Sequence, residues 1–584
     1  MTAAIDPVSL ELIHSKVTGV VGEMRVVLFH SGYSTVLRES EDGSVGLLDA
    51  QLRTVATSKK LPLHFGSFSA IADHLPRYYK PEDLEEGDVI LFNNPYEGNV
   101  THPADTITLM PVFADGSLVA HTASLAHKPD LGGPRSSGAA RDLWEEGLVI
   151  PPVKFHVRGE ANPEMERLIA ANSRLPGETM GDLRGQVAAC RAGARRVQEL
   201  CARFGAATVA AGFEELMARV ARRLREELES FPDGTHVAEA LLDHDGLNLD
   251  RPLRIHLAVS KQGDEILFDF SGSDNQAQGP VNVTPALIKN TCYFGLMAIT
   301  DPNLPFNHGF VEVAKARFKE GTIVCPRPGA AVSNYVPTVY LTSDVVLKAL
   351  GEFCPDKAVG SAGGGAGLQI RGLAPASGKP WMLMELLDTA LGATQNSDGV
   401  SLIHGTLGMG QFRPGPIEIH ETEFPLRVTR FDVRTDSGGP GKFRGGLGCI
   451  REYQVMEAAT VPVRSAQGGQ RRKLPPWGVF GGGPARAGNL FVNGVEVPDH
   501  LFEVTLKAGD VLRVELNSGG GYGDPLDRDP ELVLGDVLDG YVTVQGARDD
   551  YGVVISLETL KLDLAATAAL RRKKGKKMRR APVE

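Results

Sequence analysis

The chain of 584 residues lacks any apolar run long enough to cross a membrane, because a spanning helix needs about 18 or more apolar residues in succession. Its N-terminus, Met-Thr-Ala-Ala-Ile-Asp-Pro, has no basic region followed by an apolar core, so no secretion signal is indicated. The six cysteines include no Cys-x-x-Cys pair, which argues against a disulfide or zinc framework. We therefore expect a cytoplasmic protein with no membrane partner.

Aromatic residues are also scarce, at 6% of the chain, although apolar residues as a whole make up 42%. The 67 glycines and 37 prolines then indicate many turns and closely packed backbone rather than disorder. The length is far above that of one hydrophobic core, so several domains are expected.

Basic residues do not dominate the chain, whose formal net charge is −11. Eight of the ten residues 571–580 are lysine or arginine, so the body before them is more acidic than the total. An acidic body argues against nucleic acid as a partner. The basic tail is expected to be a solvated extension, with RNA, membrane or protein contact as the alternative.

Metal-ligating residue types gather in one short segment that contains His102, Asp105 and His127. Residues 107–113 and 118–126 are typical of two strands of a hairpin that turns at residues 114–116. An antiparallel return of this length brings His127 back beside the start of the first strand. Imidazole nitrogen with carboxylate oxygen suits Zn²⁺, Mn²⁺ or Fe²⁺, whereas Mg²⁺ and Ca²⁺ prefer oxygen alone. The alternative is that these side chains only satisfy local hydrogen bonds, and spacing does not choose between the two.

The periodicity of apolar residues predicts a mixed α/β (α+β), multidomain fold. Residues 8–30 and 162–230 show helical spacing, whereas short strands alternate with turns between residues 34 and 155. We predict the following segments: a strand-rich metal-binding catalytic domain at 1–155, a helical arm at 156–235, an α/β domain at 236–420, a β-rich C-terminal domain at 421–565, and a disordered basic tail at 566–584.

Glycine-rich segments carry a separate set of predictions. Residues 361–367 lack the lysine and Ser/Thr of a Walker loop, so close backbone packing is favoured over phosphate binding. Residues 438–448 and 518–523 are interpreted as turns of the β-rich domain.

Several short strings, in order along the chain, resemble the hydantoinase B/oxoprolinase family. They include Asp6-Pro7-Val8-Ser9-Leu10-Glu11, Leu63-His64-Phe65-Gly66-Ser67, Asn94-Pro95-Tyr96, Glu145-Glu146-Gly147-Leu148, Gly279-Pro280-Val281-Asn282, Asp436-Ser437-Gly438-Gly439-Pro440-Gly441 and Gly519-Gly520-Gly521-Tyr522-Gly523-Asp524-Pro525. The resemblance runs from residue 6 to residue 553, and its specificity lies in the ordered set.

The resemblance implies a metal-bearing subunit of a two-component, ATP-dependent enzyme that opens a cyclic amide such as a hydantoin, oxoproline or a lactam. The family's metal ligands fall here on Asp42, His102, Asp105 and His127. ATP and Mg²⁺ are expected on a partner subunit of the hydantoinase A type. A related branch, the acetone and acetophenone carboxylases, implies an alternative reaction that consumes a ketone and bicarbonate.

Two positions depart from the family's pattern. Asn94 stands where aspartate is common, and Lys128 where a second histidine is often found. Asparagine preserves turn formation, because Asn and Asp both make side-chain turns. Lys128 is expected to point into solvent, as most lysines do, and the alternative is that it anchors a carboxylate or phosphate.

Three further residues are candidates for roles around the metal. His64 is interpreted either as a proton carrier near the site or as a core histidine bonded to backbone. Tyr96 and Asp130 are candidates for orienting the ligands by hydrogen bonds.

We predict that the partner phosphorylates the carbonyl oxygen of the cyclic amide and that a metal-activated nucleophile then attacks the carbon. The alternatives are a ketone carboxylase subunit and a non-catalytic scaffold subunit.

Overall fold

The computed structural model describes residues 5–58, 61–98, 100–133, 138–374, 377–408, 412–462, 471–498, 500–501 and 503–578. The chain forms two compact units. Unit 1 comprises Met1–Phe353, Gln369–Leu386 and Leu407–Pro416, and unit 2 comprises Cys354–Leu368, Leu387–Thr406 and Ile417–Glu584. Helices and several sheets are mixed along the chain, which confirms the predicted α+β multidomain class. The segment boundaries predicted near residues 155 and 235 both fall inside unit 1.

Unit 1 is built on a seven-stranded antiparallel sheet of order β2-β1-β5-β4-β3-β6-β7. Its strands are β1 (Gly43–Asp49), β2 (Thr54–Thr57), β3 (Val89–Phe92), β4 (Asp105–Ala114), β5 (Ser117–His127), β6 (Val153–Val157) and β7 (Glu160–Ala161). Neighbouring strand residues belong to different apolar clusters, such as Leu47 and Leu48 of β1, because successive side chains point to opposite faces of a sheet. Both faces of the sheet are therefore covered.

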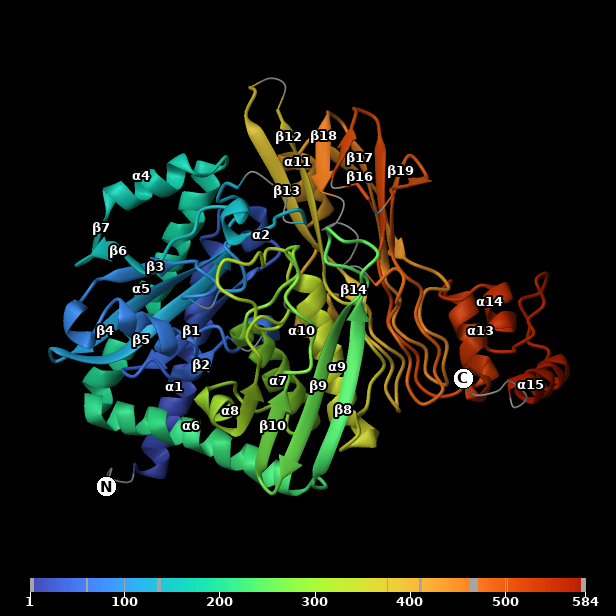
Figure 1. The fold of residues 1–584 in the computed structure, drawn as a ribbon, viewed down its shortest axis with the longest axis horizontal. Helices are drawn as coiled ribbons and strands as arrows, with labels where there is room; N and C mark the ends of the chain where they lie inside the picture. Colours follow the sequence, from blue (N-terminus) through green and yellow to red (C-terminus); the bar gives the residue numbers. More distant parts are fainter. Residues whose placement is uncertain are drawn as a thin grey trace. The chain divides into compact units, whose positions relative to one another are not determined.

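Three long helices accompany this sheet: α1 (Pro7–His30), α5 (Pro176–Phe204) and α6 (Ala206–Glu229). The Asp6 side chain accepts hydrogen bonds from the backbone N–H groups of Val8 and Ser9, and Pro7 occupies the first turn of α1, where its missing N–H costs nothing. The helical periodicity predicted for residues 8–30 and 162–230 is confirmed. Helix α5 packs against α1 and against strands β4 and β5, as Figure 1 shows in blue and teal.

A second sheet of unit 1 has the order β11-β10-β9-β8, with parallel pairing only between β10 and β11. Its strands are β8 (Gly234–Leu242), β9 (Leu253–Gln262), β10 (Glu265–Asp269) and β11 (Ala314–Arg317). The other helices of unit 1 are α2 (Thr35–Arg38), α3 (Ile71–His74), α4 (Pro163–Ala171), α7 (Pro285–Ile299), α8 (His308–Val313) and α9 (Val336–Gly351). The apolar run of α7 is an expected feature of a buried core helix.

Unit 2 contains an antiparallel five-stranded sheet of order β16-β17-β22-β19-β20. These strands are β16 (Leu426–Val433), β17 (Cys449–Val455), β19 (Asn489–Val492), β20 (Val495–Glu496) and β22 (Val511–Glu515). Further elements are β14 (Thr389–Ala390), β15 (Ser401–Ile403), α11 (Ile417–Glu423), β18 (Ala459–Pro462), β21 (Glu503–Leu506), α13 (Pro530–Leu538) and α14 (Val544–Asp549). Strands β12 (Ala366–Leu373) and β13 (Pro380–Leu387) and helix α10 (Gly405–Gly408) cross the boundaries between the two sets of residues.

The glycine-rich segments of unit 2 form closely packed extended backbone. The N–H of Gly439 donates to the carbonyl of Gly519 at 2.8 Å, and the N–H of Gly520 donates to the carbonyl of Ser361 at 2.8 Å. Close packing of residues 361–367 is thus confirmed. Residues 438–448 and 518–523 are interpreted above as turns, and this interpretation is wrong for residues 444–448 and 518–521, which have no turn, bend or other regular secondary structure. Glycine permits neighbouring backbones to approach this closely.

The C-terminal tail has a helix, α15 (Leu564–Met578), over most of the segment for which a disordered extension was predicted. Alanine, leucine, lysine and arginine are strong helix formers, and the sequence Leu-Ala-Ala-Thr-Ala-Ala-Leu-Arg-Arg-Lys-Lys contains little else. The prediction for residues 579–584 lies outside the described residues.

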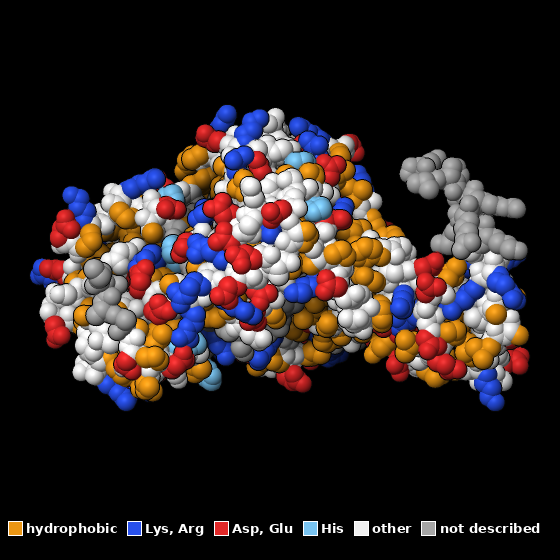
Figure 2. Space-filling model, turned by 90° about the horizontal axis from the view of Figure 1, so that it is seen from below, with side chains coloured by type: hydrophobic (Ala, Val, Ile, Leu, Met, Phe, Trp, Pro, Cys, Tyr) orange, Lys and Arg blue, Asp and Glu red, His pale blue; other side chains and the backbone are white. Residues whose placement is uncertain are grey.

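Charged side chains of both signs are interspersed on the face drawn in Figure 2. Among the described residues many charged side chains are paired, such as Arg196 with Glu23 at 2.7 Å. All six cysteines are free. Within the described part of the chain, no helix combines the length and apolar content that a membrane span requires.

Buried His121 gives unit 1 a predictable response to acid. Its Nδ1 lies 3.1 Å from the carbonyl oxygen of Asp49, which can only accept, so Nδ1 carries the proton of a neutral ring. Burial lowers the pKa of His121 to about 4, below the value of about 6.5 in an unfolded chain. The unfolded state therefore binds the proton more readily, and stability is lost as the pH falls from about 6.5 towards 4.

At pH 5 this single group is expected to cost about 2 kcal/mol of unfolding free energy relative to pH 7.5. The measurement is urea unfolding at both pH values for wild type and His121→Asn. The variant should lose less stability between the two pH values than wild type does, and equal losses would contradict the prediction.

Candidate metal centre

The predicted hairpin positions the candidate ligands. Strand β4 begins at Asp105, strand β5 ends at His127, and these two residues face each other in the antiparallel register. The turn between the strands uses Asp115 and Gly116, both with positive φ, which glycine and aspartate tolerate best. The sequence-based expectation that His127 returns beside the start of the first strand is confirmed.

The turn before β4 brings His102 to the same place. The backbone N–H of Asp105 donates to the carbonyl of His102 at 3.0 Å. The Asn93 side chain holds this turn from outside: its Nδ2 donates to the carbonyls of Pro103 at 2.7 Å and Leu148 at 2.8 Å. The buried side-chain amide of Asn93 therefore links the turn that contains His102 to the loop around residue 148.

Three donor atoms converge in this position. His127 Nδ1 lies 3.1 Å from Asp105 Oδ1 and 3.2 Å from His102 Nε2, and His102 Nε2 lies 3.4 Å from Asp105 Oδ2. Potential ligand atoms of these residues all lie within 4.8 Å of one another. Two imidazole nitrogens and a carboxylate oxygen that point at one another are the donor set of a transition-metal or zinc site.

The electrostatics of the group favour a cation at its centre. Burial opposes ionisation of Asp105, but His102 and His127 outweigh it and hold the pKa of this carboxyl well below its usual value. Burial likewise opposes a charge on His102, and Asp105 outweighs it, so the pKa of His102 is raised. Among the described residues Asp105 Oδ2 has no hydrogen-bond partner although it is fully buried. A buried carboxylate oxygen left without a donor fits a metal ligand.

Comparisons with known proteins identify the family of the chain. Residues 6–525 match the family model described as Hydantoinase B/oxoprolinase. The chain belongs to the hydantoinase B/oxoprolinase family.

Two relatives of this family member are similar to it over almost their whole length. The B subunit of a putative D-/L-hydantoinase from Pseudomonas sp. (strain NS671) is 32% identical over 97% of this chain and 98% of the relative. The beta subunit of the caprolactamase from Pseudomonas jessenii is 31% identical over 97% of this chain and 99% of the relative.

Solved structures of related proteins share the fold. The ATP-dependent caprolactamase from Pseudomonas jessenii superimposes with a TM-score of 0.89 at 30% identity, over 98% of this chain and 100% of that chain. An acetone carboxylase in its nucleotide-free form superimposes with a TM-score of 0.88 at 20% identity, over 99% of this chain and 84% of that chain. The second likeness shows a common fold alone.

Asp42, which the family resemblance gives as a fourth ligand, lies next to the cluster but is not one of its three members. Its carbonyl accepts a hydrogen bond from the His127 N–H at 3.2 Å. Burial raises the pKa of the Asp42 carboxyl to about 6, and the imidazole of His127 acts against that shift. Asp42 is therefore a buried carboxyl within electrostatic reach of all three donors, and its ligand role stays a prediction.

His64 is buried beside the same group. Its Nδ1 lies 3.0 Å from the hydroxyl oxygen of Ser44, so it is bonded to a side chain rather than to backbone. Burial lowers the pKa of His64 to about 4, with Asp105 acting in the opposite direction. A neutral His64 ring whose pKa is affected by the Asp105 carboxylate is consistent with a residue that lies just outside the set of metal ligands.

Tyr96 and Asp130 make hydrogen bonds away from the ligands. The Tyr96 hydroxyl donates to the carbonyl of Ala330 at 2.7 Å. Asp130 pairs with Arg174, whose Nε donates to Asp130 Oδ1 at 2.9 Å. The described contacts thus give Tyr96 a link to the loop at residue 330 and Asp130 an ion pair, and their predicted roles in orienting ligands gain no support.

The two departures from the family's pattern differ in outcome. The Asn94 side chain accepts from the Tyr96 N–H at 3.0 Å, which confirms that asparagine preserves the turn. The expectation that Lys128 faces solvent is wrong, because its side chain is fully buried. Its Nζ donates to the carbonyl of Ala126 at 3.0 Å. Burial lowers the pKa of Lys128 to about 8, with the carboxylates of Asp182, Asp105 and Asp42 acting in the opposite direction.

Two residues near the centre were missed by sequence reasoning. Tyr335 packs edge-on against His102, with ring centroids 5.0 Å apart, and Glu146 interacts electrostatically with His102. Tyr335 is more than 200 residues from the hairpin in sequence, so no local spacing points to it. The string Glu145-Glu146-Gly147-Leu148 was recognised as part of the family's pattern but carried no role.

Lys128 is expected to weaken metal binding, because its ammonium shares a buried environment with the ligand carboxylate. Replacing it with methionine, which keeps much of the volume, should tighten binding of Zn²⁺ on the order of tenfold by removing like-charge repulsion. Calorimetric titration of metal-free protein with Zn²⁺ measures the change. Lys16→Met, at an exposed position of α1, is the control and should bind as wild type does. Weaker binding by Lys128→Met would contradict this prediction.

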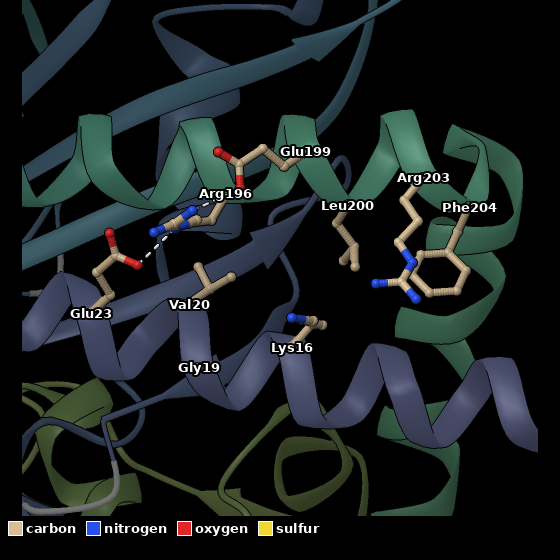
Figure 3. A pocket seen from close by; sticks show the side chains of 9 residues that line it. All are labelled: Lys16, Gly19, Val20, Glu23, Arg196, Glu199, Leu200, Arg203 and Phe204. Atoms are coloured by element: carbon tan, nitrogen blue, oxygen red, sulfur yellow. Dashed lines mark hydrogen bonds and ion pairs between the residues drawn. The ribbon is translucent and has the colours of Figure 1, made fainter.

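A groove of about 410 Å³ between α1 and α5 shares no residue with the metal cluster. Figure 3 shows Glu23 of α1 paired with Arg196 of α5 across it, and the Arg203 side chain beside the ring of Phe204. Its charged lining residues are mostly engaged with one another, so the groove carries no catalytic assignment.

Proposed function

We propose that this chain is the metal-bearing subunit of an ATP-dependent enzyme that opens a cyclic amide. The observation that carries the proposal is the convergence of His102, Asp105 and His127 at the end of one hairpin. The similarity to a caprolactamase at a TM-score of 0.89 and 30% identity supports it. The chemical class of substrate is a hydantoin, oxoproline or a lactam.

The residues present would hold a divalent zinc, manganese or iron ion through His102 Nε2, His127 Nδ1 and an Asp105 oxygen, with Asp42 as a further ligand under the family resemblance. When bound, such an ion supplies Lewis acidity that lowers the pKa of water to about 7. Asp105 and the two imidazoles would hold the ion and thereby position the nucleophile, and the ring of Tyr335 packs edge-on against His102.

A cyclic amide resists attack because resonance stabilises its carbonyl. Phosphorylation of the carbonyl oxygen by ATP would make the ring carbon more electrophilic. Residues 361–367 lack the Walker lysine, so the nucleotide and its Mg²⁺ are assigned to a partner subunit of the hydantoinase A type. Both relatives are named as one subunit of a larger enzyme, which supports a hetero-oligomer.

The decisive experiment is co-expression of this chain with its hydantoinase A-type partner and assay of ATP-dependent ring opening. Hydantoins, 5-oxoproline and caprolactam are the substrates, and the ring-opened product and ADP are measured together, with and without bicarbonate. The product is a carbamoyl amino acid from a hydantoin and an amino acid from the other two. Ring-opened product and ADP formed together support the proposal.

Two other results would replace the proposal with a different function. Consumption of acetone or acetophenone that requires bicarbonate would assign the chain to ketone carboxylation, which the shared fold with an acetone carboxylase permits. Turnover that is unchanged in Asp105→Ala would make the chain a scaffold subunit.

A further inference from the structure

Glu146 has a carboxyl within electrostatic reach of His102, with one oxygen anchored and the other without a hydrogen-bond partner among the described residues. Its Oε1 accepts hydrogen bonds from the backbone N–H groups of Val332 and Ser333, each at 2.6 Å. Its Oε2 is inaccessible to solvent and has no hydrogen-bond partner among the described residues. A buried carboxyl oxygen without a hydrogen-bond donor costs free energy of folding. Such an oxygen is therefore expected to have a role other than stabilising the fold.

Two independent links place this carboxyl near His102. Ser333 is two residues before Tyr335, whose ring packs on the His102 ring at 5.0 Å between centroids. On the other side, the Asn93 amide bonds both Pro103, next to His102, and Leu148, two residues after Glu146. The segment that donates to Oε1 and the loop that carries Glu146 are therefore each linked to the turn that contains His102.

The charged and titratable neighbours of Glu146 are consistent with a group that exchanges a proton. His102 and Tyr96 both interact with it electrostatically. Burial raises the pKa of Glu146 to about 7, against the hydrogen bonds from the backbone N–H and side chain of Ser333 and from the N–H of Val332, and against the charge of His102. A carboxyl with a pKa near the working pH can both accept and return a proton.

We propose that Glu146 is a catalytic residue that carries the proton between the attacking water and the leaving nitrogen, an inference that rests on the proposed ring-opening function. As the water oxygen forms a bond to the ring carbon, one O–H bond breaks and its proton passes to Glu146 Oε2. As the ring C–N bond then breaks, the same proton passes to the nitrogen, the second O–H proton of the water follows as the carbonyl of the acyl phosphate forms, and the nitrogen leaves as an NH2 group. Glu146 ends in its starting state, and the acyl phosphate left behind is hydrolysed by a second water.

The test compares Glu146→Gln with wild type in the complex with the partner subunit. Glutamine keeps the size of the side chain and an oxygen for the two N–H donors but cannot accept the proton. We expect metal content and the KM for the cyclic amide to stay close to wild type, whereas kcat falls about 10²–10⁴-fold, the usual contribution of general acid–base catalysis. The limb of the pH–rate profile near neutral pH should disappear. Glu145→Gln, one residue away, is the matched control and should retain wild-type kinetics.

An infrared difference titration of the metal-free chain gives a readout that does not depend on turnover. Asp42 and Asp388 also titrate in this range, so the comparison is quantitative: wild type should show one more carboxyl that titrates near neutral pH than Glu146→Gln does. Wild-type kcat and pH profile in Glu146→Gln, loss of metal from it, or no such additional titrating carboxyl in wild type would each overturn the inference. If the carboxyl titrates as expected but wild type opens no cyclic amide, the proposed ring-opening function fails, and with it this role of Glu146.

Discussion

Replacing His127 with alanine is expected to abolish stoichiometric binding of a divalent metal and, with it, ring opening by the complex. The reason is geometric, because His127 Nδ1 contacts both Asp105 Oδ1 and His102 Nε2 and is therefore central to the three converging donors. Loss of an outer-shell partner already costs about 10–100-fold in metal affinity, so removal of a direct ligand should cost more than about 100-fold. Elemental analysis of purified protein and calorimetric titration with Zn²⁺ measure the effect.

The matched control for this experiment lies on the same strand. His121 is also buried in β5, but it bonds the carbonyl of Asp49 and is not one of the three donors. His121→Asn should therefore keep its metal at pH 7.5. Metal retained at full occupancy by His127→Ala would contradict the site as described, whereas loss in both variants would indicate damage to the strand rather than to a ligand.

The second large effect is expected at Gly445, in the extended glycine-rich backbone of unit 2. A Cβ atom at this position would lie 1.8 Å from the carbonyl oxygen of Gly519 and 2.5 Å from its carbon. Both atoms belong to backbone, which cannot rotate away as a side chain can. Gly445→Ala should therefore lower the unfolding free energy by more than about 4 kcal/mol, the range reserved for severe packing defects, or prevent folding of unit 2.

Gly535→Ala is the control for this substitution. Gly535 lies inside helix α13, and nothing comes within 4 Å of an added Cβ. Alanine there should raise stability by about 0.5–1 kcal/mol, because glycine is the poorer helix former. Urea unfolding followed by circular dichroism compares the two variants. An unfolding midpoint for Gly445→Ala equal to that of wild type would show that the two backbones are not in contact.

Some of the centre could be predicted because it is local in sequence. A hairpin of known length places its first and last residues opposite each other, so Asp105 and His127 were paired from spacing alone. His102 belongs to the turn just before the first strand. The family resemblance added Asp42, which does lie beside the cluster, although it is not one of the three converging donors.

Lys128 shows where residue type misleads. Lysine is usually exposed, and that rule gave the wrong environment for a side chain that lies fully buried. The strand ends at His127, so alternation along β5 does not reach the next residue. Lys128 lies within electrostatic reach of Asp182 of helix α5, a contact that the local sequence does not predict. The glycine-rich segments misled in the same way, because glycine is common both in turns and in close backbone contacts.

The family, the helical and strand periods, and the hairpin with two of the three donors could all be predicted from the sequence, because each is carried by short stretches of neighbouring residues. The surroundings of that hairpin could not be predicted in this way. The N–H groups of Val332 and Ser333 reach Glu146 across more than 180 residues of sequence, and Tyr335 reaches His102 across more than 230. Contacts at that separation are set by how sheets and helices pack, and it is packing that leaves a carboxyl oxygen buried without a partner beside the ligands.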